Sequence, residues 1–154
     1  MDDLVVKWLH ILSSTFLFGT GIGSAFYMLF TSLSRDVRAI AVVSRHVVLA
    51  DWIFTASAGI IQPLTGAYLI YLAGFAWTSS WIMWSVALYL LAGACWLPVV
   101  WIQIRMRDMA QVAARAGSDL PQQYWRYLRT WTLLGIPAFI AMVAVFWLMV
   151  TKPL

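Results

Sequence analysis

The sequence predicts an all-α fold, an integral membrane bundle of four antiparallel helices with kinks, and three observations carry this prediction. Charged residues are absent from residues 8–34, 52–104 and 130–151. The chain is 63% hydrophobic, with a mean hydropathy of +0.84, whereas soluble domains are only about 45–50% apolar. The arginines all lie between the charge-free runs. A chain with this composition is suited to lipid as its solvent.

The length of each charge-free run gives the number of spans. A transmembrane helix needs about 20 mainly apolar residues, because ~30 Å of hydrocarbon is crossed at ~1.5 Å per residue. The first and last runs each supply one span, and the uncharged stretch 74–80 predicts a turn that divides the central run into two. We therefore expect helices at about 4–33, 37–73, 80–114 and 120–151, forming a single domain over residues 1–154.

Prolines and a glycine predict the shape and the ends of these helices. Pro63, Pro98 and Pro137 fall inside the second, third and fourth helices, where a proline frees a backbone carbonyl and favours a kink. Gly117 is a candidate helix end, and Pro121 suits a helix start. The connections are short, so neighbouring helices are expected to be antiparallel.

The arginines predict the orientation of the bundle. Arg35, Arg38 and Arg45 follow the first charge-free run, and the other five arginines lie between residues 104 and 130. By the positive-inside rule both arginine-rich connections are cytoplasmic and both termini lie outside the cytoplasm. Tryptophan and tyrosine gather near both predicted interfaces, as in an aromatic belt. The positions of the cations that make up the net charge of +4 therefore predict the orientation in the membrane. The lipid bilayer is the expected partner, and no nucleic acid is expected.

The first helix carries a mildly polar stripe that includes His10, Gly21 and Ser24. Its small residues either leave a slot for a flat ligand or let helices approach closely. His10 is either a neutral, hydrogen-bonded histidine near the outer interface or a metal ligand, because imidazole is a common axial ligand of haem iron. His46 lies on the cytoplasmic part of the second helix, where a solvated surface role is expected.

The second helix has the most polar face of the four. This face aligns Asp51, Thr55, Gly59, Gln62 and Gly66. A buried lone carboxylate is costly, so Asp51 is expected to form an ion pair with Arg105 or Arg129, with proton handling as the alternative. Gln62 either hydrogen-bonds across the bundle or lines a ligand pocket.

Several chemistries find no support in the sequence. The chain has no glutamate, a single cysteine at Cys95, no clustered histidines and no phosphate-binding loop. Hydrolytic and metal-cluster enzymes are therefore not predicted, and the internal repeat with broken half-helices found in many transporters is also lacking.

Six short motifs spread over nearly the whole chain carry a family resemblance. They are KWLHIL at 7–12, GTG at 19–21, VLADW at 48–52, QPLTG at 62–66, GACWLP at 93–98 and IQIRMRD at 102–108. With these motifs the chain resembles a bacterial family of small, four-span predicted integral membrane proteins of no assigned function. The resemblance implies a bacterial cytoplasmic (inner) membrane protein.

More distantly, the chain is similar to the membrane-bound protoporphyrinogen oxidase of the HemJ type and to CopD-like membrane domains of copper resistance. The similarity rests on Leu9-His10 early in the first helix, on Pro137 in the last helix and on Lys152-Pro153 at the end. The oxidase resemblance implies haem b with His10 as the metal ligand. Gln103 lies where the oxidase has a later histidine, so haem binding is implied more directly than porphyrinogen oxidation.

The predicted function is therefore a haem b protein with a redox or electron-transfer role. His10 would ligate the iron, and four further residues would shape the pocket: Gly21, Ser24, Gln62 and Gly66. Electrons would pass to or from a quinone, a porphyrin or a redox protein, and assembly into a homo-oligomer is left open. The alternative is a non-catalytic membrane scaffold or accessory subunit, with a small transporter as a third hypothesis.

Overall fold

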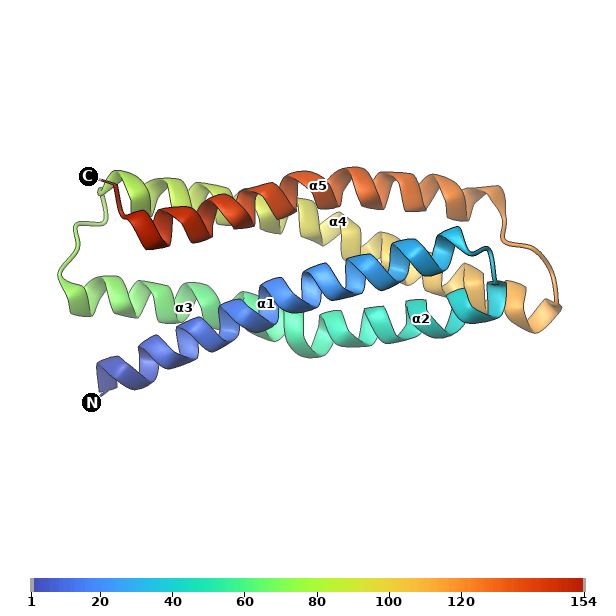
Figure 1. Ribbon diagram of the computed structural model, residues 1–154, viewed down its shortest axis with the longest axis horizontal. Coiled ribbons are helices and arrows are strands. Elements are labelled where there is room, and N and C mark those ends of the chain that lie inside the picture. Colours follow the sequence, from blue (N-terminus) through green and yellow to red (C-terminus); the bar gives the residue numbers. More distant parts are fainter. Residues whose placement is uncertain (1, 154) are drawn as a thin grey trace.

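The computed structural model describes residues 2–153, and long helices that run side by side make up nearly all of this part (Figure 1). The elements are α1 (Asp2–Leu33), α2 (Val37–Ala50), η1 (Asp51–Thr55), α3 (Ala56–Ala73), α4 (Ser80–Ala116) and α5 (Gln122–Thr151). Because α2, η1 and α3 follow one another without a break, they form one continuous rod. The four predicted helices are thus confirmed, and the described residues contain no strand.

Specific residues mark the starts and ends of the helices. Asp36 caps α2, because its Oδ1 accepts hydrogen bonds from the backbone amides of Arg38 (3.0 Å) and Ala39 (3.1 Å). Gly74 and Gly117 follow α3 and α4 with φ of +69° and +63°, the left-handed conformation that glycine adopts without strain. Pro121 stands directly before α5. The predicted end at Gly117 and start after Pro121 are confirmed.

The five-residue π-helix η1 was not predicted. It replaces the α-helical pattern at Asp51–Thr55, so that the backbone amide of Ala56 bonds to the carbonyl of Asp51, five residues earlier. Such an insertion into an α-helix turns the side chains that follow and often marks a functional position. The three prolines lie inside α3, α4 and α5, as predicted.

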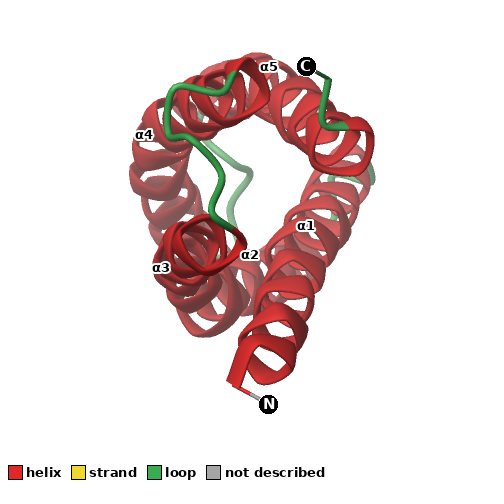
Figure 2. Cartoon of the chain, turned by 90° about the vertical axis from the view of Figure 1, so that its left-hand side faces the viewer, coloured by secondary structure: helices red, strands yellow, loops and turns green. Residues whose placement is uncertain are grey.

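Two of the helices cross the bundle obliquely. Figure 1 shows α5 along one side and the α2–η1–α3 rod along the other, with α1 and α4 running obliquely between them. We call the end with the connections 34–36 and 117–121 the arginine end, and the opposite end, with both termini and the connection 74–79, the terminal end (Figures 1 and 2). In the described chain α2 packs on α4, whereas α3 packs on α1 and η1 and hardly on α4 or α5.

An apolar core fills the bundle toward the arginine end. It contains Met28, Ile40, Val47, Val99, Ile102, Met106, Ala110, Tyr124, Leu128 and Trp131. These residues come from α1, α2, α4 and α5, so all four helical rods contribute to it. The core therefore fixes the helices relative to one another at this end.

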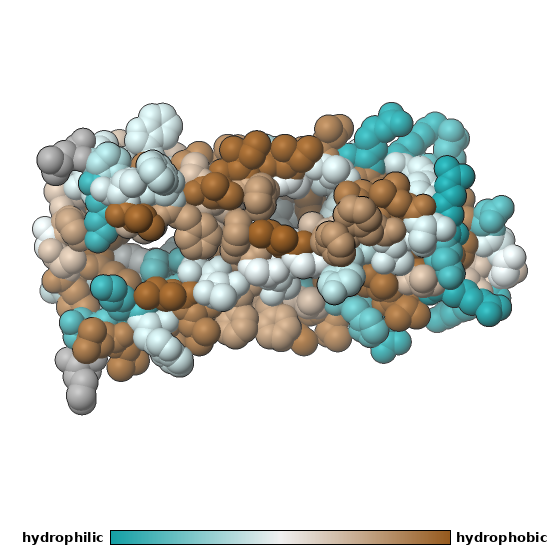
Figure 3. Space-filling model, in the orientation of Figure 1, coloured by the Kyte–Doolittle hydropathy of each residue, from teal (hydrophilic) through white to brown (hydrophobic). Residues whose placement is uncertain are grey.

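Apolar side chains also cover the outside of the bundle. Leu64, Leu97 and Val150 are among many large apolar residues that are mostly exposed. Figure 3 shows hydrophilic residues gathered at the arginine end and hydrophobic ones along the middle of the molecule. Four helices are long and apolar enough to cross a membrane, and their exposed apolar surface is suited to contact with lipid. The protein is a multi-pass integral membrane protein.

One buried hydrogen bond joins α1 to α5 next to the apolar core. Ser32 and Tyr124 are both fully buried, and their hydroxyl oxygens lie 2.7 Å apart. The Ser32 hydroxyl also lies 2.7 Å from the carbonyl of Met28, to which it donates, so Tyr124 is the donor to Ser32. This bond ties the first helix to the last one.

We expect the substitution Tyr124→Phe to lower the free energy of unfolding by about 1 kcal/mol, because it removes one buried hydrogen bond without opening a cavity. Unfolding in mixed detergent micelles measures the change. Tyr27→Phe is the matched control, because Tyr27 is 63% exposed and its substitution should change little. Equal losses in the two variants would contradict the assigned role of the Ser32–Tyr124 bond.

Candidate functional site

The structure brings three of the predicted site residues together where α1 packs against α3. Nδ1 of His10 lies 2.8 Å from Oγ1 of Thr65, and Nε2 of His10 lies 3.1 Å from Nε2 of Gln62. Gly66 lies beside the ring, so close that a Cβ there would be 3.2 Å from Cε1 of His10. We call His10, Ser13, Gln62, Thr65 and Gly66 the His10 cluster.

The hydrogen bonds of the cluster fix the protonation of the imidazole. Oγ1 of Thr65 donates to the carbonyl of Ile61 (2.8 Å) and therefore accepts from Nδ1 of His10. The Gln62 amide nitrogen can only donate, so Nε2 of His10 is the acceptor. His10 is thus a neutral imidazole with its hydrogen on Nδ1 and a lone pair on Nε2.

Ser13 completes the cluster on the α1 side. Its hydroxyl contacts Oε1 of Gln62 and also lies 3.0 Å from the carbonyl of His10. The cluster is therefore a continuous chain of polar groups from Ser13 through Gln62 and His10 to Thr65. Interhelical hydrogen bonds of this kind are worth about 0.6–2 kcal/mol each in membranes, so the cluster also holds α1 against α3.

The donor set of the cluster fits one axial bond to haem iron. A ligating histidine usually donates its other ring N–H to a fixed acceptor, and Thr65 supplies that acceptor to His10. The ligating nitrogen would be Nε2, which is engaged only by the amide of Gln62, a neutral group on a rotatable side chain. The described residues contain no group of three histidine, cysteine or acidic side chains that could hold a metal ion.

Two other predicted pocket residues do not lie in the cluster. Gly21 is eleven residues beyond His10 on α1, which is about 16 Å along the helix axis, and a Cβ at Gly21 would meet no atom within 4 Å. The Ser24 hydroxyl bonds within its own helix, to the carbonyl of Gly21 (3.3 Å). The structure therefore separates Gly21 and Ser24 from the cluster.

Sequence reasoning missed the part played by Thr65. A usable signal was its spacing, because a residue three positions after Gln62 lies on the same side of a helix. The prediction included Gly66 on that face instead, and the structure shows that both positions border the His10 ring.

A second buried polar cluster lies at η1. Asp51 is only 4% exposed, and its Oδ1 accepts a hydrogen bond from Oγ1 of Thr55 (2.9 Å). The side chain of Gln103, from α4, lies beside the Asp51 carboxyl. We call Asp51, Thr55 and Gln103 the Asp51 cluster.

The predicted ion pair of Asp51 is not formed, and this expectation was wrong. The guanidinium of Arg105 lies over the ring of Trp101, 5.3 Å from its centroid, and its side chain is exposed. Arg129 is also exposed. Among the described residues, Arg107 forms an ion pair with Asp108, and the two charged groups lie 2.7 Å apart. His46 is exposed on α2, as expected for a surface residue.

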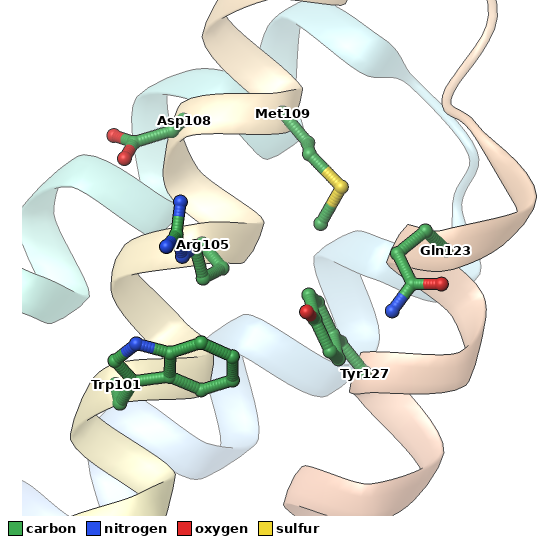
Figure 4. Close-up of a pocket in the computed structure, with 6 residues that line it drawn as sticks. All are labelled: Trp101, Arg105, Asp108, Met109, Gln123 and Tyr127. Atoms are coloured by element: carbon green, nitrogen blue, oxygen red, sulfur yellow. The ribbon is translucent and has the colours of Figure 1, made fainter.

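A shallow groove of about 250 Å³ lies near the arginine end, between α4 and α5. It is lined by Trp101, Arg105, Asp108, Met109, Gln123 and Tyr127. Figure 4 shows Arg105 above the indole of Trp101 on α4, with Gln123 and Tyr127 on the facing helix. None of these residues belongs to the His10 or the Asp51 cluster.

The fold and the two clusters define a four-span integral membrane protein with polar groups buried between its helices. The chain belongs to the family of predicted integral membrane proteins designated DUF2269, whose sequence model matches residues 4–153. The predicted family membership is thereby confirmed. No curated protein and no solved structure matches the chain.

We expect Gly66→Ala to lower the free energy of unfolding by about 1–3 kcal/mol, the usual cost of overpacking. The added methyl group would lie 3.2 Å from Cε1 of His10 and push the ring away from Thr65 and Gln62. Gly135→Ala on α5 is the control, because a Cβ there meets nothing within 4 Å. Unfolding in mixed micelles compares them, and a Gly66 variant as stable as the Gly135 variant would refute this packing.

Proposed function

We propose that this protein is a haem b-binding membrane protein with a redox or electron-transfer role, in which His10 supplies an axial ligand to the iron. The observation that carries the proposal is the hydrogen-bond pattern of His10. Its Nδ1–H is held by Thr65, which leaves the lone pair on Nε2. This is the arrangement that orients histidine ligands in metal proteins.

Each residue of the His10 cluster would have a separate task toward the haem. Thr65 keeps the ring in one orientation and one tautomer, and Gly66 leaves the space that the imidazole itself occupies. Gln62 would rotate away from Nε2 and could keep its contact with Ser13. When bound, haem b would accept and release single electrons, and the chain would tune it through ligation and the low dielectric of its surroundings.

The electron partner would reach the protein from the bilayer or from a neighbouring protein. A quinone dissolved in the lipid, a porphyrin or a redox protein are the classes that match a membrane haem. The exposed apolar surface of the helices is open to lipid-soluble partners. The proposal therefore places electron transfer inside the membrane and not in a water-filled site.

A second candidate function is a non-catalytic scaffold or accessory subunit. The observation that favours it is that both ring nitrogens of His10 already have partners inside the chain. On this hypothesis the His10 cluster only holds α1 against α3. Replacing His10 would then weaken the fold and change no spectrum.

Absorption spectra of protein purified after haem-supplemented expression separate the two candidates. We expect a Soret band in the wild type that is lost in His10→Ala, because the only ligating nitrogen of the cluster is removed. His46→Ala is the matched control and should keep the band, since His46 is exposed on α2. A colourless wild type, or an unchanged spectrum in His10→Ala, would reject the haem proposal in favour of the scaffold.

We also propose that the protein lies in a bacterial cytoplasmic membrane with both termini outside the cytoplasm. All eight arginines belong to the arginine-end connections and the helix ends next to them, which by the positive-inside rule face the cytoplasm. The single cysteine, Cys95, makes a simple labelling test feasible.

In a Cys95→Ser background, we expect Thr78→Cys to react with a membrane-impermeant maleimide in intact spheroplasts. Ser118→Cys should react only after permeabilisation, because it lies in the connection at the arginine end. Both positions are exposed, so a difference in labelling reports sidedness and not burial. Labelling with the opposite sidedness would overturn the proposed orientation.

A further inference from the structure

The Asp51 cluster contains a carboxylate that is buried without a cationic partner. Asp51, Thr55 and Gln103 are each at least nine-tenths buried, and they come from η1 and α4. Lipid and apolar protein stabilise an isolated carboxylate very poorly. A buried ionised carboxylate therefore needs a positive charge next to it.

None of the elements packed against η1 supplies that charge in the described chain. α1 and α3 carry no charged residue between residues 8 and 33 and between 56 and 73, and His10 is neutral and engaged by α3. On α2, α4 and α5, the basic side chains nearest to the cluster in the sequence do not contact Asp51. They are exposed or, in the case of Arg107, paired with Asp108: Arg45, His46, Arg105, Arg107 and Arg129. The carboxyl group thus faces only neutral groups.

Gln103 supplies a second observation at this cluster. Its Oε1 atom is buried and has no hydrogen-bond partner among the described residues, although the residue is only 2% exposed. Buried polar atoms are nearly always paired in native proteins. Oε1 is an acceptor, so the group that would pair with it must be a proton donor or a cation.

We propose that Asp51, Thr55 and Gln103 form an intramembrane site for one monovalent cation, either a proton or a sodium ion. The shared chemistry is a single positive charge held among carboxyl, hydroxyl and amide oxygens, which are the ligands that hard cations prefer. A proton would reside on the Asp51 carboxyl, whereas a sodium ion would be held by all three side chains. One carboxylate matches one positive charge, so a divalent ion is not expected.

The test uses the full-length protein in detergent and has one arm for each cation. In sodium-free choline buffer, infrared difference spectra between acidic and alkaline pH detect the C=O stretch of a protonated carboxylic acid. In the second arm, sodium replaces choline at constant ionic strength and the melting temperature is recorded. We expect either an acid band that belongs to Asp51 or a rise in melting temperature with sodium.

Asp51→Asn should abolish whichever signal is found, because it removes the charge and keeps the shape of the side chain. Asp108→Asn is the matched control and should leave the signal intact, since Asp108 is exposed and paired with Arg107. Gln103→Leu should shift the acid band or remove the sodium effect, and it carries the test if the Asp51 variant does not fold.

A carboxylate that stays ionised over the whole pH range, together with a melting temperature that does not respond to sodium, would overturn the proposal. A signal that survives in Asp51→Asn would also overturn it. Neither arm depends on haem, so the outcome is independent of the function proposed for His10.

Discussion

Lipid offers no hydrogen-bond partners, and the arrangement of the polar side chains follows from this constraint. Thr132, like Ser14 and Thr15, donates to a carbonyl of its own helix, which satisfies it without a neighbour. Larger polar groups cannot be satisfied in this way and occur where two helices meet, as His10 does against α3 and Tyr124 against α1. Helix contacts and polar pairing are therefore determined together, and a change at one of these residues affects both.

The two ends of the bundle are held together by different forces. Toward the arginine end, side chains from all four rods pack into one apolar core, so close van der Waals contact dominates there. Toward the terminal end α3 has little contact with α4 or α5, and single polar contacts matter more. Tyr89 reaches from α4 to the carbonyl of Gly59 (2.6 Å), and His10 reaches from α1 to Thr65. At this end α3 is therefore joined to α4 through Tyr89, and to α1 through both packing and the His10 cluster.

The sequence was sufficient for the helices and for part of the His10 cluster, for identifiable reasons. Charge-free runs set the spans, and glycine and proline set their ends. His10, Gln62 and Gly66 were predicted as one site because each lies on the most polar face of its helix. Gly21 and Ser24 were predicted for the same site but lie outside the His10 cluster, since helical spacing gives the face of a residue but not the depth at which two helices cross. The π-helix η1 has no sequence pattern of its own, and depth alone could not show that Arg105 stacks on Trp101 and not on Asp51.

The two polar clusters differ in what they need from outside the chain. The His10 cluster consists of neutral dipoles, and neutral partners on α3 satisfy both ring nitrogens of His10. The Asp51 cluster contains a group that is charged when deprotonated, and dipoles alone stabilise a buried charge incompletely. The hydroxyl of Thr55 and the amide of Gln103 therefore cannot replace a counter-charge, and Oε1 of Gln103 has no hydrogen-bond partner among the described residues. Charge balance, and not packing, is thus what distinguishes the two sites.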